Sequence, residues 1–329
     1  SRNMLPVAVD AMGGDHAPDA IVAGALLAAE SGTPVTLVGP ADLPSRVDTG
    51  SLPLIEASEV IEMDEDPAHG VRRKKDSTLV RAAEAVRDGA ASAMVSAGNT
   101  GAAMASGLLR MGRIRGVGRP AIAAMIPVPG GTPTVLLDAG ANSEVQADWL
   151  VQFAQMGSIF AEHRLGIAEP RVGLLSIGEE AGKGDSLRKE AFGLLDESTG
   201  FNFIGNVEGR DVMSDDCDVV VTDGFTGNVV LKTLEGAMRQ VMSALTEAVT
   251  ANAELADHAT ALLPEILPLQ TSLEAETYGG AMLLGTNGVC IISHGSSSPT
   301  AINNAIGVAR DMVDADVVGS IAAAIQPHD

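Results

Sequence analysis

Short apolar runs recur along this chain, and most are separated by longer segments in which apolar residues return every three or four positions. The runs of strand length are Leu5–Asp10, Pro34–Val38, Ala93–Ser96, Ala121–Ile126, Thr134–Leu137, Val172–Ser176, Val219–Thr222 and Val289–Ile292. The segments with helical spacing include Asp19–Ser31, Ser77–Asp88, Glu144–Glu162 and Asp185–Asp196. Such alternation is typical of a largely parallel sheet covered by helices on both faces. It predicts a three-layer αβα fold over residues 4–329, either as a single catalytic unit or as two closely joined subdomains.

One long stretch breaks the alternation. From Val229 to Leu269 the spacing stays helical with no intervening strand, which predicts a protruding helical hairpin over residues 229–275. Its far end, Ala261–Leu269, is apolar and contains two prolines, so we expect it to be bent. The side chains expected to make a dimer contact or a shallow membrane contact there are Leu262, Leu263, Ile266 and Leu267. Dimer packing is favoured, because a lipid-facing helix usually carries Lys or Arg on its polar face and this segment is acidic.

Composition and charge narrow the function classes. The 329 residues are 46% hydrophobic, which excludes general disorder, and the formal net charge of −22 argues against nucleic acid as a partner. The basic residues are nevertheless clustered, in Arg72–Lys75 and again between Arg110 and Arg119. On so acidic a protein these clusters suggest an acidic partner or ligand, although solvated loops and helix faces explain them equally simply.

Nothing in the sequence predicts a metal, a disulfide or an export signal. The two cysteines form no C-x-x-C pattern and the six histidines lack metal-ligand spacing. No charged start precedes an apolar core near residue 1, and no apolar run approaches the length of about 18 residues that a membrane span needs. We therefore expect a cytoplasmic protein that contacts a membrane at most peripherally, at the cytoplasmic face.

Polar, glycine-containing turns follow five of the apolar runs: A-M-G-G-D-H-A-P after Asp10, A-G-N-T-G-A after Ser96, D-A-G-A-N after Leu137, I-G-E-E-A-G-K-G-D after Ser176 and D-G-F-T-G-N after Thr222. In an open parallel sheet the ligand crevice lies outside the carboxyl ends of the strands, so these turns are expected to converge on one site. The candidate site residues that they supply are Gly13, Gly14, Asp15, His16, Asn99, Thr100, Gly101, Asn142, Lys183, Gly227 and Asn228.

The chemistry of these turns suits an anion or a carbonyl group. Glycines allow close backbone approach, and the free N–H groups of a first helical turn attract anions. Lys183 supplies a cation between two glycines, able to neutralise a phosphate or an oxyanion. Each turn by itself is equally well explained as an ordinary capped turn. Gly178–Gly184 is not a Walker loop and the first turn lacks the G-x-G-x-x-G fingerprint, so no nucleotide cofactor is predicted.

Nine motifs in order resemble those of the PlsX family of bacterial phosphate acyltransferases. They are V-A-V-D-A-M-G-G-D-H-A-P (from Val7), S-A-G-N-T-G-A (from Ser96), G-R-P-A-I (from Gly118), D-A-G-A-N (from Asp138), I-G-E-E-A-G-K-G-D (from Ile177), G-N-V-E-G-R-D (from Gly205), D-G-F-T-G-N-V-V-L-K (from Asp223), Y-G-G-A-M-L-L-G (from Tyr278) and H-G-S-S (from His294). Met282 stands where the family commonly has proline.

The resemblance implies an enzyme that transfers a long acyl chain from acyl carrier protein to inorganic phosphate, giving acyl phosphate for phospholipid synthesis. It implies a homodimer with a fold similar to isopropylmalate dehydrogenase and phosphate acetyltransferase, with no metal or cofactor. The family's catalytic lysine and asparagine map onto Lys183 and Asn228. If phosphate is the attacking group, no protein nucleophile is needed, and catalysis rests on positioning and charge stabilisation.

The implied partners give the basic clusters a purpose. Acyl carrier protein is acidic, so Arg72, Arg73, Arg113 and Arg115 are candidate docking residues. Weak contact with the inner membrane and with a downstream acyltransferase that uses acyl phosphate is also expected. Two alternatives remain open: a short-chain phosphate acyltransferase that uses acyl-CoA, and a non-catalytic scaffold that binds acyl carrier protein or lipid.

Overall fold

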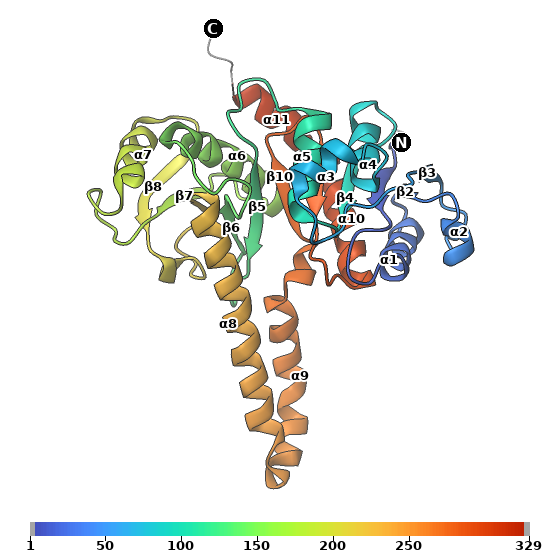
Figure 1. The fold of residues 1–329 in the computed structure, drawn as a ribbon. Coiled ribbons are helices and arrows are strands. Elements are labelled where there is room, and N and C mark those ends of the chain that lie inside the picture. The colour runs from blue at the N-terminus through green and yellow to red at the C-terminus, as the bar shows by residue number, and fades with distance from the viewer. Residues whose placement is uncertain (1–3, 326–329) are drawn as a thin grey trace.

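The computed structural model describes residues 4–325 as an α/β fold in which, over that range, eleven strands form one sheet with the order β3-β2-β1-β4-β11-β10-β5-β6-β9-β7-β8 (Figure 1). The strands are β1 Val7–Asp10, β2 Val35–Gly39, β3 Leu54–Glu56, β4 Ala93–Ser96, β5 Ala121–Ile126, β6 Thr134–Leu137, β7 Arg171–Leu175, β8 Asn202–Val207, β9 Val219–Val221, β10 Ala281–Leu284 and β11 Val289–Ile292. The predicted α/β class and largely parallel sheet are confirmed.

Fifteen helical segments accompany the strands within the described residues. They are α1 Asp19–Glu30, α2 Leu43–Arg46, α3 Pro67–Arg73, α4 Thr78–Arg87, α5 Thr100–Ser106, the π-helical turn η1 Gly107–Met111, α6 Ala147–Leu165, α7 Ser186–Glu197, η2 Gly209–Asp211, α8 Gly224–Thr250, η3 Ala253–Leu255, α9 Ala256–Leu273, η4 Ala275–Tyr278, α10 Pro299–Asp314 and α11 Val317–Ala324. Asp185, Asp223 and Ser298 cap α7, α8 and α10 through side-chain bonds to backbone N–H groups.

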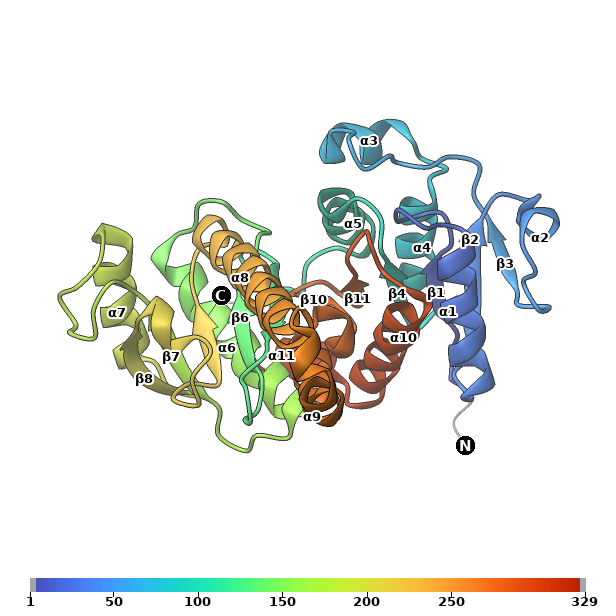
Figure 2. The same cartoon turned by 90° about the horizontal axis from the view of Figure 1, so that it is seen from below.

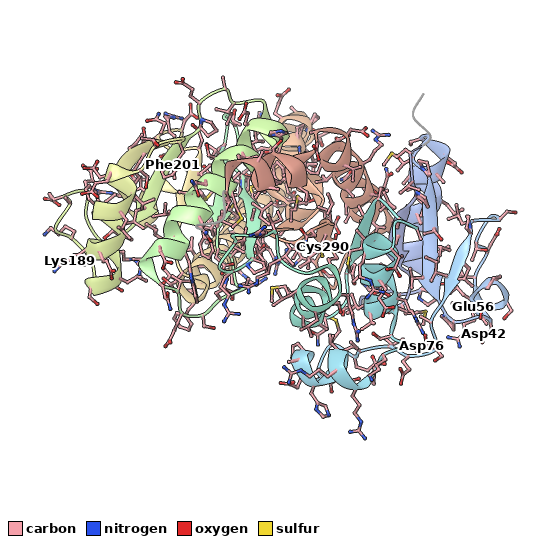
Figure 3. All side chains as sticks on the ribbon, turned by 90° about the horizontal axis from the view of Figure 1, so that it is seen from above. Asp42, Glu56, Asp76, Lys189, Phe201 and Cys290 are labelled. Carbon is pink, nitrogen blue, oxygen red and sulfur yellow. The ribbon has the colours of Figure 1, made fainter. Side chains whose placement is uncertain are left out.

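The sheet consists of two parallel groups joined by antiparallel pairs. β3, β2, β1, β4 and β11 run parallel to one another, and so do β6, β9, β7 and β8. Between the groups, β10 pairs antiparallel with β11 and β5, and β5 pairs antiparallel with β6. The two groups therefore run in opposite directions within one sheet. Figure 3 shows its length: Cys290 lies at the middle of the molecule, and Lys189 and Asp42 lie toward opposite ends.

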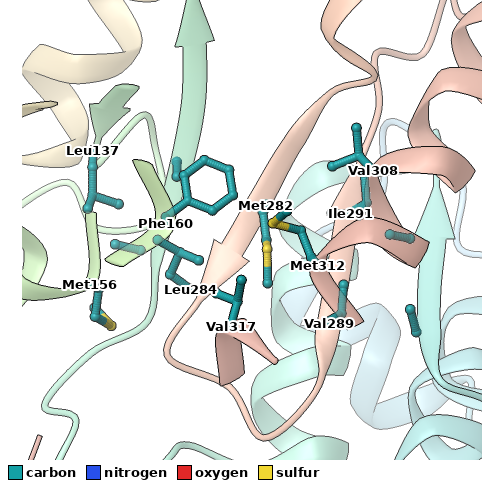
Figure 4. Close-up of a cluster of buried hydrophobic side chains, with 14 of the residues drawn as sticks. Leu137, Met156, Phe160, Met282, Leu284, Val289, Ile291, Val308, Met312 and Val317 are labelled. Atoms are coloured by element: carbon teal, nitrogen blue, oxygen red, sulfur yellow. The ribbon is translucent and has the colours of Figure 1, made fainter. Parts of the chain in front are cut away.

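Strand residues alternate between two helical layers, as the pleat requires. Val7 and Val9 face a core built with α1, α6, α7, α10 and α11, while Ala8 faces the layer of α3, α4 and α5. At the centre of the first layer, Phe160 of α6 lies toward Leu284 of β10, and Met312 of α10 lies toward Met282 of the same strand (Figure 4). This continuous core extends from one strand group to the other.

α8 and α9 form the hairpin, which projects away from the sheet (Figure 1). The chain reverses at residues 251–255, so Ala261–Leu269 lies within α9 and not at the tip. The expectation that those residues form the far end of the hairpin is wrong, and α9 continues through Pro264 and Pro268. Both prolines are exposed, so water can satisfy the carbonyl groups that lose an N–H partner. Within residues 4–325, no helix combines the length and apolar composition needed to cross a membrane.

Candidate active site

A cavity of about 350 Å³ opens on the face of the sheet between α5 and α8; we call it the sheet cavity. Figure 2 shows α5 and α8 on either side, with β10 and β11 between them. Its lining residues are Thr100, Ile122, Ala124, Met125, Ala139, Asn228, Leu231, Lys232, Glu235, Tyr278, Gly280, Ala281, Ile292, Ser293, His294 and Gly295. Loops that follow β4, β11, β6 and β9 contribute, so turns from both strand groups converge even though the groups run in opposite directions.

The first turn of α8 brings Asn228 into the sheet cavity. A Cβ at Gly227 would lie 1.8 Å from the Asp138 carbonyl oxygen, and one at Gly224 would lie 2.4 Å from the Asn142 carbonyl oxygen. Only glycine permits this approach of helix and loop. Asn228 itself is exposed, and its Nδ2 donates to the Ala139 carbonyl oxygen at 3.3 Å. The amide is thus held at the cavity wall and remains open to a ligand.

The buried carboxylate of Asp138 shapes the opposing loop. Backbone N–H groups of Ile122, Gly140, Ala141 and Asn142 donate to it at 2.7–3.1 Å, and the Asn142 side chain donates at 3.0 Å. Burial raises the pKa of Asp138, and these donors oppose that shift. Asn142 Nδ2 also donates to the Pro120 carbonyl oxygen at 2.8 Å, so the side chain of this predicted ligand residue is occupied within the loop.

The turns after β1 and β4 are assembled around a second buried carboxylate, Asp10. Ser96 Oγ donates to it at 2.8 Å, and Gly13 packs so closely that a Cβ would lie 2.5 Å from its Oδ2. The pKa of Asp10 is raised by burial. The Asp15 N–H donates to the Gly295 carbonyl oxygen at 2.7 Å, which joins this turn to the loop after β11. Gly13, Gly14, Asp15 and His16 do not line the sheet cavity, although Asp15 is bonded to Gly295, which does.

Asn99 and Gly101 serve the packing of α3 against α5. The buried Asn99 accepts from the Ala102 N–H and donates to the carbonyl oxygens of Glu62 and Glu65 at 3.0 and 3.1 Å. A Cβ at Gly101 would lie 2.5 Å from Pro67. From this predicted turn, Thr100 alone of the three candidates lines the sheet cavity.

Lys183 lies in the exposed loop after β7 and does not line the sheet cavity. Its backbone is fixed by the Glu180 carbonyl and by Ser176 Oγ, which donates to the Lys183 carbonyl at 3.1 Å. Arg188, at the start of the next helix, binds Asp223 at 2.6 Å and so connects this loop to the N-terminus of α8. The predicted pair Lys183 and Asn228 is therefore on adjoining elements, but only Asn228 is in the cavity.

The sequence patterns do not single out Lys232 and Glu235, which lie one and two helical turns beyond Asn228. Lys232 Nζ lies 3.8 Å from Glu235, whose other carboxylate oxygen lies 3.1 Å from His294 Nε2. Their spacing from Asn228, at i+4 and i+7, could have indicated them, because such positions share one helix face. They place a cation and a carboxylate–imidazole pair in the sheet cavity.

A second hollow of about 850 Å³, the hairpin groove, extends from His294 and Glu235 along α8 and α9. Most of its lining residues are polar or charged, while Met238, Met242 and Leu273 add apolar surface. It shares Glu235 and His294 with the sheet cavity, so the two spaces adjoin.

Neither cysteine is a candidate nucleophile. Both are buried, and burial raises the pKa of Cys217 to about 11 and that of Cys290 to about 12. A thiol with so high a pKa carries almost no thiolate at neutral pH. Residues 4–325 contain no group of three or more His, Cys, Asp or Glu side chains arranged to hold a metal ion.

The predicted docking residues lie on two separate elements. Arg72 and Arg73 are exposed on the last turn of α3. Arg115 is exposed in the loop after η1, whereas Arg113 Nη1 donates to the carbonyl oxygens of Val117 and Gly118 and so stabilises that loop. On the hairpin, Leu262 and Leu267 are 49% and 53% exposed, while Leu263 and Ile266 are half-buried.

Comparison with known proteins assigns the chain to a family. The model of the family described as "Fatty acid synthesis protein" matches residues 5–320. The chain is 46% identical over 328 residues to the phosphate acyltransferase of Geobacillus sp. (strain WCH70), covering 98% of this chain and 99% of that protein. It is 44% identical over 322 residues to the phosphate acyltransferase of Bacillus subtilis (strain 168), covering 96% and 97%.

Solved structures share the fold at much lower identity. A branched-chain phosphotransacylase from Enterococcus faecalis V583 superposes with a TM-score of 0.61 at 17% identity, covering 94% of this chain and 99% of that one. A 4-hydroxythreonine-4-phosphate dehydrogenase from Klebsiella pneumoniae gives 0.54 at 13% identity, covering 95% and 99%. These likenesses agree with the predicted fold class.

Proposed function

Because the chain belongs to the fatty acid synthesis protein family and is a phosphate acyltransferase of phospholipid synthesis, we propose that it moves a long acyl chain from acyl carrier protein to inorganic phosphate. The observation that carries this proposal is the sheet cavity, where the Asn228 amide, the Lys232 ammonium and His294 surround an apolar floor of Ile122 and Ala124. The polar edge suits phosphate and the thioester carbonyl, and the floor suits the beginning of an acyl chain.

In this proposal a phosphate oxygen attacks the thioester carbonyl and the carrier thiolate departs. Asn228 donates to the oxyanion that develops on the carbonyl oxygen, and Lys232 neutralises the phosphate. Lys183 keeps the catalytic role that the resemblance implies, as a cation that approaches the site from its exposed loop beside the start of α8. The hairpin groove, with its many polar groups, is the proposed path of the carrier's pantetheine arm.

The test is to incubate the purified protein with palmitoyl acyl carrier protein and phosphate, trap acyl phosphate with hydroxylamine and follow release of the carrier thiol. Phosphate-dependent product that is lost in Lys183→Ala supports the proposal. Product from short acyl-CoA but not from acyl carrier protein would favour the short-chain enzyme. Carrier binding without product would favour the non-catalytic scaffold.

Docking of the acidic carrier is proposed to use the exposed arginines of α3 and of the loop after η1. The double change Arg72→Glu with Arg73→Glu, or Arg115→Glu alone, is expected to raise the KM for acyl carrier protein about tenfold with little change in kcat, because a rim charge mainly steers association. Arg113 is left intact because it stabilises its own loop.

The measurement is the KM for acyl carrier protein at low and at high salt. At high salt the difference in KM between wild type and the docking variants should shrink, because salt screens exposed charges. Lys189→Glu, on α7 at the far end of the molecule, is the charge-matched control and should leave KM unchanged (Figure 3). A KM that stays at the wild-type value in both docking variants would remove these surfaces from the account.

We also propose a cytoplasmic homodimer in which a second copy covers the exposed apolar side chains of the hairpin. Leu262→Asp with Leu267→Asp is expected to convert dimer to monomer in light scattering, whereas Thr260→Asp on the same helix should not. A dimer that persists while binding to anionic vesicles is lost would instead assign these side chains to peripheral membrane contact. In either case the acyl phosphate is proposed to pass to a downstream acyltransferase.

A further inference from the structure

His294 stands at the junction of the sheet cavity and the hairpin groove and lines both. Its Nε2 lies 3.1 Å from Glu235 Oε1, and the two side chains are 39% and 19% exposed. Among the remaining carboxylates of the hairpin groove, Glu276 is the nearest in sequence to His294. It accepts hydrogen bonds from the Ser298 N–H and Oγ and not from the imidazole. Glu235 is therefore the carboxylate that faces the imidazole.

A carboxylate that accepts from one ring nitrogen of an imidazole determines which nitrogen carries the proton. With the Nε2 proton donated to Glu235, Nδ1 carries the free lone pair of the neutral ring. Nδ1 has no hydrogen-bond partner among residues 4–325. An imidazole that is oriented by a carboxylate and open on its other nitrogen is the arrangement that moves protons in acyl transfer.

The proposed reaction requires such a proton movement. Hydrogen phosphate and a thioester are converted to acyl phosphate and a thiol, so one proton must pass from the attacking phosphate to the departing sulfur. Neither Asn228 nor Lys232 can accept it, since an amide is not basic and the ammonium has no free lone pair.

We infer that His294 is the proton relay of this reaction and that Glu235 is its positioning residue; the inference rests on the proposed function. As the phosphate oxygen forms its bond to the carbonyl carbon, Nδ1 takes the phosphate proton and the carbonyl π pair moves onto oxygen. When that pair returns, the C–S bond breaks with its electrons on sulfur, and Nδ1 gives the proton to the thiolate. Glu235 stays ionised and stabilises the transient imidazolium.

The test compares two acyl donors that differ in their need for that proton. Acyl pantetheine releases an alkyl thiolate, which leaves poorly without a proton, whereas the S-phenyl thioester of the same acid releases a weakly basic aryl thiolate. His294→Gln is expected to lower kcat about 10²-fold with acyl pantetheine and only a few-fold with the S-phenyl thioester. KM should stay near its wild-type value, and Glu235→Gln should show the same donor dependence with a smaller loss.

His258→Gln, exposed on α9 far from the cavity, is the matched control and should behave as wild type with both donors. Thermal unfolding of each variant checks that the fold is kept. Equal losses with both donors, or no loss in a folded His294→Gln, would overturn the relay. A wild-type protein that forms no acyl phosphate even from palmitoyl acyl carrier protein would overturn the proposed function itself.

Discussion

Replacing Asn228 by Ala is expected to lower kcat for acyl phosphate formation by about 10²–10³-fold while KM for phosphate changes little. The magnitude is that of removing one preorganised oxyanion donor from an active site. Asn228 fits that role because its backbone is fixed by the close packing of Gly227 on Asp138 and its Nδ2 bond to Ala139 holds the amide at the cavity wall. The bond strengthens only as charge develops on the substrate oxygen, so the loss should fall on kcat.

The measurement is a steady-state assay of thiol release with varied phosphate. Asn202→Ala, an exposed asparagine at the beginning of the outer strand β8, is the control and should keep the wild-type kcat. A kcat within threefold of wild type in Asn228→Ala would remove this side chain from the transition state, and the oxyanion donor would have to be sought elsewhere in the cavity.

Replacing Gly227 by Ala is expected to lower the free energy of unfolding by about 3 kcal/mol or more and to lower kcat strongly as well. The added Cβ would lie 1.8 Å from the Asp138 carbonyl oxygen, a backbone atom that cannot rotate away. Relief requires a shift of α8 from the Asp138 loop, which displaces Asn228. Stability and catalysis should therefore fall together.

Gly236→Ala is the matched control on the same helix, because a Cβ there meets nothing within 4 Å. It is expected to leave kcat unchanged and to raise stability by up to about 1 kcal/mol, since alanine is the better helix former. Thermal and urea unfolding with parallel activity assays measure both effects. Wild-type stability in Gly227→Ala would show that the helix and the loop do not pack as closely as described.

The layered fold could be predicted because apolar residues form short continuous runs in most strands and recur every three or four positions in the helices. β4, β5, β6 and β11 coincide with the apolar runs predicted for them. β3 and β8 were missed for local reasons: β3 has only three residues, and β8 is rich in Asn and contains Gly205 with φ +100°. β10 is four residues long and lies within a glycine-rich motif, so the sequence does not mark it as a strand; its two antiparallel pairings, together with that of β5 with β6, set the opposite direction of the second strand group.

The site could be predicted only in part, because a polar residue in a turn can equally well bind substrate or form hydrogen bonds that stabilise its own loop. Thr100 and Asn228 line the cavity, whereas the side-chain amides of Asn99 and Asn142 donate to backbone carbonyl groups. The difference depends on which loop packs nearby, and that is not encoded in the turn itself. Lys232, Glu235 and His294 were brought together by tertiary packing of α8 against the loop after β11.

In the proposed reaction, phosphate attacks the thioester directly in the sheet cavity, and no protein residue becomes acylated. The measurement is the transfer of label from isotopically labelled free acyl carrier protein, with its thiol unacylated, into unlabelled palmitoyl acyl carrier protein, catalysed by the purified protein with and without phosphate. Direct attack by phosphate predicts no exchange without phosphate, and both exchange and acyl phosphate once phosphate is added. Exchange in the absence of phosphate would reveal an acyl–protein intermediate and contradict direct attack.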